Sequence, residues 1–292
     1  MSENPAPRIS VIVPHYNDLE RLDACLAALE VQSLPRDSFE VIVADNRSPV
    51  GMDEVVRVVG ARGRVVDAPV AGAGMARNSG VEHARAPVLA FTDCDCVPGP
   101  HWLEHGVAAL ESADFVGGRM RVLVDNPAHM SGAEAFEAVF AFDNRGYVLR
   151  EHFTVTANLF CPRDLFHKIG PFRTEVSEDK EWCLRARTLG YRIGYAEKAV
   201  VGHPARADYA QLKGKWKRMA SESYALFRQD GGSRLRWLGR TWMLPLSILA
   251  HGPRILTSKE LPDMTARLRA LATLVRIRLW RFREGHRQVF GI

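Results

Sequence analysis

The sequence predicts an α/β fold in which a mainly parallel β-sheet is covered by helices on both faces. Short apolar runs alternate with segments whose leucines recur at helical spacing, and each run is continuously apolar. Continuous apolar runs are typical of strands that are buried on both faces of a sheet. Strands that alternate with helices are typical of parallel sheets, because each parallel strand needs a crossover connection.

The expected elements follow these runs along the chain. Residues 9–13 form the first apolar run and residues 39–44 the second. Between them, residues 18–33 carry leucines at near-helical spacing and end before Pro35, which predicts a helix. The remaining expected elements are a helix near 52–59, a strand at 64–67, a helix over 74–85, strands at 87–91 and 114–124, and helices near 132–143 and 178–189.

Charge divides the 292 residues into two parts. Residues 1–205 contain 21 Lys and Arg against 28 Asp and Glu, whereas residues 206–292 contain 18 against 6. We therefore expect one α/β domain over 1–205 and a basic helical region over 206–292. A basic region fits a polyanionic partner, either a membrane surface or nucleic acid. We expect no nucleic-acid partner, because no recognised binding motif accompanies the basic residues.

The cysteines and the first residues bear on the compartment. The five cysteines form no paired framework, and residues 1–8 contain no apolar region of the kind that a secretory signal needs. Both observations favour a reducing, cytoplasmic compartment. Cys94 and Cys96 have no second pair to complete a zinc site, so burial of these two thiols is the favoured interpretation.

The segment Thr92-Asp93-Cys94-Asp95 directly follows the apolar run at 87–91. Two carboxylates at a strand end offer hard oxygen ligands, which suit Mg²⁺ or Mn²⁺, and such a cation commonly holds a phosphate. Surface turns are also rich in aspartate, so the motif alone is weak evidence. Its position at the end of a buried strand strengthens the prediction of a metal site.

Other polar residues follow the ends of other strands. His15 follows the first predicted strand and Asp45 the second. In open α/β sheets the ligand lies beyond the carboxyl ends of the strands, so these residues are expected to converge with Asp93 and Asp95 on one crevice. For Asp45 alone, a role as a turn or helix-capping residue is the favoured interpretation.

Together these features resemble the family 2 glycosyltransferases with the GT-A fold, which is Rossmann-like. The resemblance covers roughly residues 8–205 and rests on seven motifs in order. They are residues 11–17 (VIVPHYN), 43–45 (VAD), 74–80 (GMARNSG), 91–95 (FTDCD), 156–160 (TANLF) and 177–181 (SEDKE), followed by His203.

The resemblance implies a binding site for a nucleotide-sugar donor. Asp45 would accept hydrogen bonds from the base or the ribose, and Arg77 would approach the base or the diphosphate. Asp93 would hold the ribose or the sugar. The donor-binding residues implied by the family are Pro14, His15, Tyr16, Asp45, Arg77, Asn78 and Asp93.

The resemblance also implies the metal ligands and the catalytic base. Asp95 would bind Mn²⁺ or Mg²⁺ directly, with His203 as a further ligand that tilts the choice towards Mn²⁺. Asp179 would be the general base that deprotonates the acceptor hydroxyl. Acidic residues also favour the first turn of a helix for dipole reasons alone, which is the alternative for Asp179. The acceptor-side residues implied are Asn158, Glu178 and Trp182.

The activity implied is metal-dependent, inverting transfer of one sugar, favoured to be UDP-linked, to a hydroxyl of a glycan or a lipid-linked acceptor. The family's common setting is synthesis of cell-envelope glycans or exopolysaccharides. Processive synthesis is disfavoured because residues 211–216 (QLKGKW) lack the Gln-x-x-Arg-Trp motif of polymerising relatives. The alternatives are a nucleotidyltransferase acting on sugar phosphates and a catalytically silent, membrane-bound adaptor with the same fold.

The basic region carries two amphipathic segments. Residues 237–250 are apolar but interrupted by Arg240 and Pro245, which favours an interfacial or re-entrant segment. Residues 264–283 combine an apolar helical stripe with arginines. These features predict peripheral association with an anionic membrane, on the inner face of the cell membrane. The alternative is a helical subdomain that packs on the catalytic domain. The stripe consists of Met264, Leu268, Leu271, Val275, Leu279 and Phe282.

Overall fold

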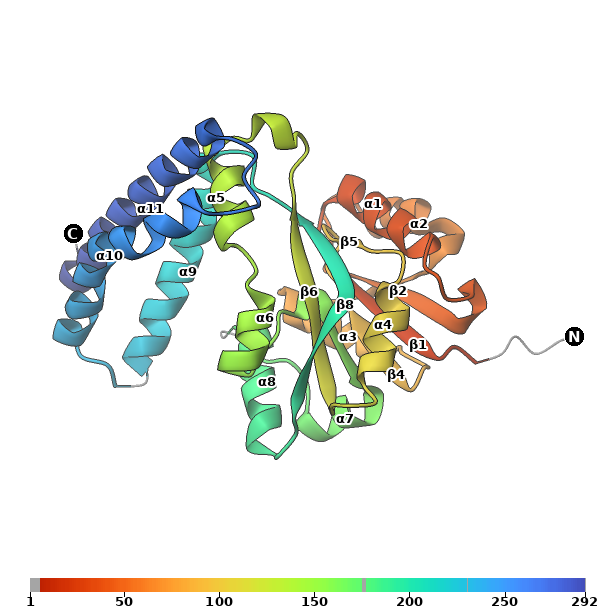
Figure 1. The fold of residues 1–292 in the computed structure, drawn as a ribbon. Helices are drawn as coiled ribbons and strands as arrows, with labels where there is room; N and C mark the ends of the chain where they lie inside the picture. The colour runs from red at the N-terminus through yellow and green to blue at the C-terminus, as the bar shows by residue number, and fades with distance from the viewer. Residues whose placement is uncertain (1–5, 175–176, 230, 292) are drawn as a thin grey trace, which may run out of the picture. The chain divides into compact units, whose positions relative to one another are not determined.

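The computed structural model describes residues 6–174, 177–229 and 231–291. Residues 1–5 of the amino-terminal segment considered above lie outside the described residues. The chain divides into two compact units (Figure 1). The first unit is Met1–Arg121 with Phe142–His203, and the second is Val122–Ala141 with Pro204–Ile292. The second unit thus includes a segment that precedes the expected boundary at residue 205.

The strands form one eight-stranded sheet in the order β3-β2-β1-β4-β7-β6-β8-β5. Pairing is parallel between β1 and β2, β2 and β3, and β1 and β4. It is antiparallel where β4 meets β7, β6 meets β7 and β5 meets β8. The expected parallel arrangement is confirmed for β1 to β4, and the later strands add antiparallel pairs. The strands are β1 Ile9–His15, β2 Phe39–Asp45, β3 Arg64–Asp67, β4 Val88–Phe91, β5 Val97–Pro98, β6 Phe115–Leu123, β7 Leu159–Pro162 and β8 Ile193–Pro204.

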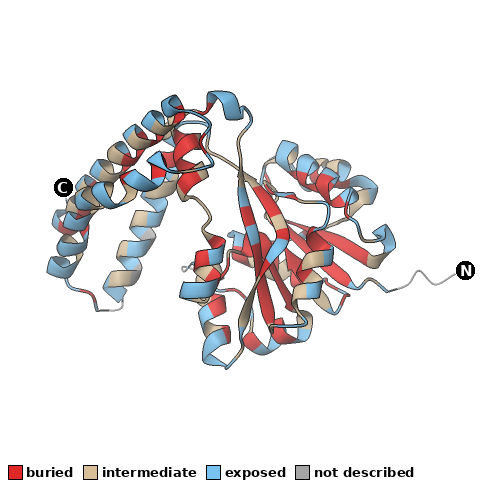
Figure 2. Cartoon of the chain, in the orientation of Figure 1, coloured by how far each residue is buried: buried red, intermediate tan, exposed pale blue. Residues whose placement is uncertain are grey.

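Helices cover both faces of this sheet, as predicted. Successive strand residues point to opposite faces, so Val11 of β1 packs with one set of helices and Ile12 with the other. Figure 2 shows the buried residues concentrated along the strands and the inward sides of the helices. On the Val11 face lie α1 Leu19–Glu30, α2 Met52–Val59 and α4 Trp102–Ala109. On the Ile12 face lie α3 Ala73–Glu82, α7 Arg163–Ile169 and α8 Glu178–Thr188.

The strand register brings the predicted site residues to one edge of the sheet. His15 of β1 pairs with Asp45 of β2, and Ile12 of β1 pairs with Phe91 of β4. The residues that follow Phe91 therefore begin beside the end of β1. The short helix α6 Asn144–Gly146 and a π-helical turn at Tyr147–Glu151 precede β7.

The second unit is helical. Its core joins Phe136 of α5, Leu212 of α9, Ile255 of α10 and Leu274 of α11. Side chains cap two of its helices, Ser131 at the start of α5 and Asp263 at the start of α11. The helices are α5 Gly132–Phe140, α9 Tyr209–Gln229, α10 Arg234–Leu256 and α11 Met264–Phe290.

The two amphipathic segments of the basic region belong to long helices. Residues 237–250 lie inside α10, which continues through Pro245 and Pro253. Residues 264–283 lie inside α11. Among the described residues, none of the helices combines the length and the apolar character that crossing a bilayer requires.

Candidate active site

The two aspartates after β4 lie in a tight, hydrogen-bonded loop at the sheet edge. The backbone N–H of Thr92 donates to the carbonyl of Ile12 at 3.2 Å, which fixes the start of the loop beside β1. The N–H of Cys96 donates to the carbonyl of Asp93 at 3.0 Å and closes the turn. A carboxylate oxygen of Asp93, one of Asp95 and Sγ of Cys96 all lie within 4.8 Å of one another.

The buried guanidinium of Arg77 connects this loop to the start of α8. One of its amino groups forms an ion pair with the carboxylate of Asp93, and the other donates to Oε1 of Glu178 at 3.0 Å. Burial alone would lower the pKa of Arg77, but the charges of Asp93 and Glu178 outweigh it, and the pKa is raised. Arg77 therefore stays charged and compensates the negative charge of both carboxylates.

Asp95 lies beside His203 at the end of β8. The distance between Oδ2 of Asp95 and Nε2 of His203 is 3.4 Å, and the His203 ring lies tilted against that of Phe142, with 4.6 Å between their centroids. Burial raises the pKa of Asp95; His203 opposes this shift, and the neighbouring charge of Asp93 adds to it. A cation bound here would favour the charged form of Asp95.

The donor atoms present fit Mn²⁺ or Mg²⁺. Asp93 and Asp95 supply hard carboxylate oxygens, and His203 supplies a nitrogen that Mn²⁺ accepts more readily than Mg²⁺. Cys96 does not complete a thiolate site, because burial raises its pKa well above the ordinary value and keeps the thiol protonated. Burial likewise raises the pKa of Cys94, to about 12. All five cysteines are free.

His15 and Asp45 form a buried pair at the ends of β1 and β2. Nδ1 of His15 lies 2.8 Å from Oδ1 of Asp45. Nε2 of His15 accepts from the N–H of Asp18 at 3.1 Å, so Nδ1 carries the proton and donates to the carboxylate. Ser48 completes the group, since its hydroxyl donates to Oδ1 at 2.5 Å and its N–H donates to Oδ2 at 3.0 Å.

The other residues predicted to bind the donor differ in exposure. Tyr16 is exposed directly after β1, and Pro14 is buried within it. The side-chain amide of Asn78 pairs with the backbone of Phe172, donating to its carbonyl and accepting from its N–H, both at 2.9 Å. Asn78 thereby ties α3 to the loop before α8.

Asp179 lies in the first turn of α8, next to Glu178. The hydroxyl of Ser177 donates to its Oδ1 at 2.8 Å and the N–H of Lys180 to the same oxygen at 2.7 Å. Burial raises the pKa of Asp179 above its ordinary value of 3.8, and the Ser177 hydrogen bond opposes that shift. A carboxylate with a raised pKa is a stronger base than an ordinary one, which suits proton abstraction.

Two of the predicted acceptor-side residues lie in the interior. Asn158 is buried, accepts from Nε1 of Trp102 at 2.9 Å, and donates to the carbonyls of Arg119 and Ala199. Trp182 is buried in the aromatic core and donates from Nε1 to the carbonyl of Gly170 at 3.0 Å. Both side chains connect elements around the site, and their polar groups are engaged within the protein.

In the structure, many of the predicted site residues lie in three groups, and the members of each group contact one another. Asp93, Arg77 and Glu178 form one group, Asp95 and His203 a second, and His15 with Asp45 a third. Sequence reasoning missed Ser48 and Phe142, which complete the third and second groups. Ser48 follows Asp45 by three residues, a spacing at which a capping side chain accepts from a backbone N–H, and this spacing could have indicated it. Nothing in the sequence pattern indicated Phe142.

Comparison with known proteins shows which family the chain matches. Residues 10–173 match the family described as Glycosyl transferase family 2. The chain is 31% identical over 219 residues to Glycosyltransferase AglE of Haloferax volcanii, covering 72% of this chain and 71% of that protein.

Two solved structures show a similar fold. The mannosyltransferase PcManGT of Pyrobaculum calidifontis, in complex with GDP-Man and Mn²⁺, has a TM-score of 0.62 at 19% identity and covers 98% of this chain and 88% of its own. S. aureus TarS 1-349, in complex with UDP-GlcNAc, has a TM-score of 0.53 at 20% identity and covers 96% and 92%. With the matched family and the relative above, these findings identify the chain as a glycosyltransferase that belongs to glycosyl transferase family 2.

Proposed function

We propose that the chain transfers one sugar from a nucleotide-sugar donor, with a UDP-sugar favoured, to a hydroxyl acceptor with inversion at the anomeric carbon. The observation that carries the proposal is the pair formed by Asp95, in the loop after β4, and His203, at the end of β8, next to an Asp93 whose charge Arg77 compensates. This arrangement leaves Asp95 as the carboxylate whose charge a divalent cation would stabilise.

The donor nucleoside would lie over the ends of β1 and β2. The His15–Asp45–Ser48 group holds this edge rigid, because Asp45 accepts three hydrogen bonds in a buried position. Exposed Tyr16, next to it, offers a ring on which a base can stack. The two similar solved structures contain different donors, GDP-Man and UDP-GlcNAc, so they do not decide which nucleotide this chain uses. The preference for UDP follows from the resemblance of the sequence motifs.

The diphosphate would lie at the loop after β4. Asp95 and His203, with Asp93, would hold Mn²⁺ or Mg²⁺, and the ion would stabilise the charge that develops on the leaving diphosphate. Arg77 would keep the loop in position through its ion pair with Asp93. The same guanidinium binds Glu178, so it also sets the position of the first turn of α8 relative to the loop.

Asp179 would take the proton from the acceptor hydroxyl as the oxygen attacks the anomeric carbon. Its raised pKa supports this role, because the carboxylate then holds the proton more readily. Asp179 is the one base that we assign among the described residues, with no second nucleophile assigned there, and this corresponds to direct displacement, which inverts the anomeric centre. Asn158 and Trp182 would support the acceptor side from the interior, and Glu178 would do so through Arg77.

The acceptor would be a glycan or a lipid-linked molecule, as in cell-envelope glycan or exopolysaccharide synthesis. The chain would act in the cytoplasm, attached peripherally to the inner face of the cell membrane through the basic helices of the second unit. The excess of arginine in α10 and α11 supports attraction to anionic lipid.

Hydrolysis of a panel of nucleotide-sugars tests the proposal. Each donor would be incubated with Mn²⁺, Mg²⁺ or EDTA, with wild type, Asp95→Ala and Asp67→Ala. Asp67 ends β3 but lies outside the aspartate loop, so it is the matched control. We expect metal-dependent release of one nucleoside diphosphate by wild type and Asp67→Ala and none by Asp95→Ala. Failure of every donor to bind in calorimetry would contradict the proposal and favour a catalytically silent adaptor.

A further inference from the structure

One side of helix α10 exposes large apolar side chains that share a single face. Trp242, Leu246 and Leu249 are 60%, 59% and 78% exposed. Helical geometry rotates successive residues by about 100°, and this rotation places the exposed side chains within one sector, opposite the side that packs in the core. We define the outer face of α10 as Leu235, Trp242, Met243, Leu246, Leu249 and Leu256.

The outer face of α10 is free of charge over its length. The residues that helical geometry places between its large side chains are Gly239, Ala250 and Pro253, which are uncharged. Exposed apolar patches that extend over a whole helix are rare on monomeric proteins and commonly mark an interaction site.

The apolar surface continues onto α11. The ring of Trp242 contacts two rings of that helix, Phe282 at 4.9 Å and His286 at 5.7 Å between centroids. On the same side of α11, Met264 and Leu268 are exposed. These residues belong to the apolar stripe that the sequence predicted, while α11 packs into the core with a different set that includes Ala270 and Ile277.

Positive charge borders this surface. Helix α10 contains four arginines and no Asp or Glu, and α11 contains seven arginines and one Glu. The outer face has two long edges, and Trp242 lies nearer to one of them. Helical geometry places the exposed Arg236 and Arg254 along the other edge. The lone acid, Glu284, is paired with Arg287 at 2.8 Å. Within α10 and α11, the cationic border of the outer face is therefore not offset by any unpaired acidic residue.

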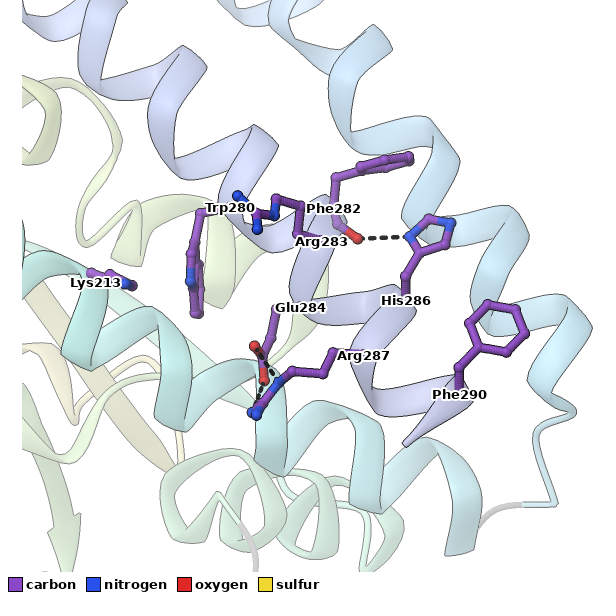
Figure 3. Close-up of a pocket in the computed structure, with 8 residues that line it drawn as sticks. All are labelled: Lys213, Trp280, Phe282, Arg283, Glu284, His286, Arg287 and Phe290. Carbon is purple, nitrogen blue, oxygen red and sulfur yellow. Dashed lines mark hydrogen bonds and ion pairs between the residues drawn. The ribbon is translucent and has the colours of Figure 1, made fainter. Parts of the chain in front are cut away.

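A pocket on α11 adds cationic and aromatic groups (Figure 3), and two of its lining residues, Phe282 and His286, contact the ring of Trp242. Lys213 of α9 contributes to it, with its ammonium 5.8 Å from the ring of Trp280, and Arg283 and Phe290 line it as well. Aromatic rings next to arginine and lysine are typical of surfaces that lie in the headgroup region of a bilayer.

We propose that the outer face of α10, continued by Met264 and Leu268 of α11, is the surface that docks on an anionic lipid bilayer. The proposal rests on the membrane attachment put forward above and names the surface that performs it. The apolar side chains would enter the interfacial region while the bordering arginines meet the lipid phosphates. A second copy of the chain is disfavoured as the occupant, because it would bring arginines against arginines.

Vesicle flotation with the full-length protein tests this surface. Vesicles of phosphatidylcholine alone and of phosphatidylcholine mixed with phosphatidylglycerol would be compared for wild type, Leu246→Glu/Leu249→Glu and the control Val56→Glu. Val56 is an exposed apolar residue of helix α2 in the first unit. We expect wild type and Val56→Glu to float with the anionic vesicles, and the double variant to bind about tenfold or more weakly. Far-ultraviolet circular dichroism and donor hydrolysis would check that each variant is folded.

Quenching by lipids brominated in the acyl chain gives a second readout. Trp242 is one of six tryptophans. We expect quenching in wild type that is largely lost in Trp242→Phe, which would place this ring in the bilayer interface.

The outcomes separate this proposal from the enzymatic one. Equal binding of wild type and the double variant would overturn the α10 surface while leaving membrane attachment intact. No vesicle binding by wild type would overturn both, and self-association that the double variant abolishes would then identify a second copy as the occupant. Donor hydrolysis is measured without vesicles, so none of these results bears on the glycosyltransferase activity.

Discussion

Nε2 of His203 lies 3.4 Å from Oδ2 of Asp95, which joins the end of β8 to the loop after β4. The two residues are more than 100 positions apart in the chain, and the sheet places β8 two strands beyond β7, the partner of β4. The metal-binding residues predicted from the motifs are thus held by separate parts of the fold. A change at His203 would therefore test the proposed metal binding without changing the aspartate loop itself.

His203→Ala should weaken activation by Mn²⁺ more than activation by Mg²⁺. Loss of a metal ligand or its close support typically reduces metal affinity by about 10–100-fold, and imidazole is a better ligand for Mn²⁺. The measurement is donor hydrolysis as a function of each metal concentration. His101→Ala, at an exposed histidine paired with Glu104, serves as the control and should change neither curve. Equal losses with both ions would argue against direct ligation by His203.

Asp179→Asn should remove transfer to the acceptor while leaving donor binding unchanged, because the amide cannot accept the proton. In wild type, burial raises the pKa of Asp179 above 3.8. The base form therefore appears only as the pH rises through this raised value, so kcat/KM should increase with pH on its acid side.

The pH profile of kcat/KM and calorimetric donor binding check this prediction. Asp164→Asn changes an exposed carboxylate in the first turn of α7 and is the matched control. An Asp179→Asn enzyme that keeps a normal rate and the same acid limb would rule out Asp179 as the base.

Arg77→Met should destabilise the protein by about 3–5 kcal/mol, because it leaves Asp93 and Glu178 without their shared buried cation. Arg77→Lys should recover only part of this loss, since an ammonium cannot span two carboxylates as a guanidinium does. Urea unfolding measures the difference. Arg47→Met removes an exposed ion pair with Asp67 and should cost less than about 1 kcal/mol. Similar costs for Arg77→Met and Arg47→Met would contradict the connecting role of Arg77.

The sequence predicted the sheet edge and its polar residues well because both depend on local patterns. Continuous apolar runs located β1, β2 and β4 to within two residues, and strand ends then placed Asp45 and Asp93. Side-chain hydrogen bonds between distant segments could not be predicted from local patterns. Asn78, for example, pairs with the backbone of Phe172, which lies 94 residues further along the chain. The same limit applies to α11. Its apolar stripe was visible, but small residues such as Ala270 form its buried face, and hydrophobicity alone does not mark them.

Glu137→Gln should make the second unit less stable at neutral pH and less sensitive to acid. Glu137 is buried between Arg206 and Lys215, at 2.8 and 2.9 Å. Burial alone would raise the pKa of Glu137, but the two cations outweigh it, so the folded pKa lies below the ordinary 4.5. Its stabilisation is therefore complete above about pH 4.5 and is lost as the pH falls through the lower folded value.

Urea unfolding at pH 7 and at pH 3 checks this prediction. Wild type should lose more stability between these values than Glu137→Gln does. Glu260→Gln, at an exposed position, should behave like wild type. If the free energy of unfolding of wild type and of Glu137→Gln changes equally with pH, Glu137 is not the group responsible for the acid sensitivity.

Two glycines of the α10–α11 pair should respond in opposite directions to alanine. A Cβ on Gly285 of α11 would lie 2.5 Å from Oγ1 and 2.7 Å from Cγ2 of Thr241, so these helices touch at this point. Gly285→Ala should therefore destabilise the protein by about 1–3 kcal/mol. A Cβ on Gly239 of α10 would meet nothing within 4 Å, and Gly239→Ala should stabilise the helix by about 0.5–1 kcal/mol.

A double-mutant cycle shows whether the contact with Thr241 causes the loss. Thr241→Ala removes both atoms that the new methyl group would meet most closely, so Gly285→Ala should cost much less in that background than in wild type. Thermal and urea unfolding of the four proteins in the cycle supply the free energies. If Gly285→Ala costs the same in both backgrounds, its effect does not come from the approach of α10 to α11. If the two changes are coupled, the glycine at position 285 is what allows α10 and α11 to pack closely at Thr241.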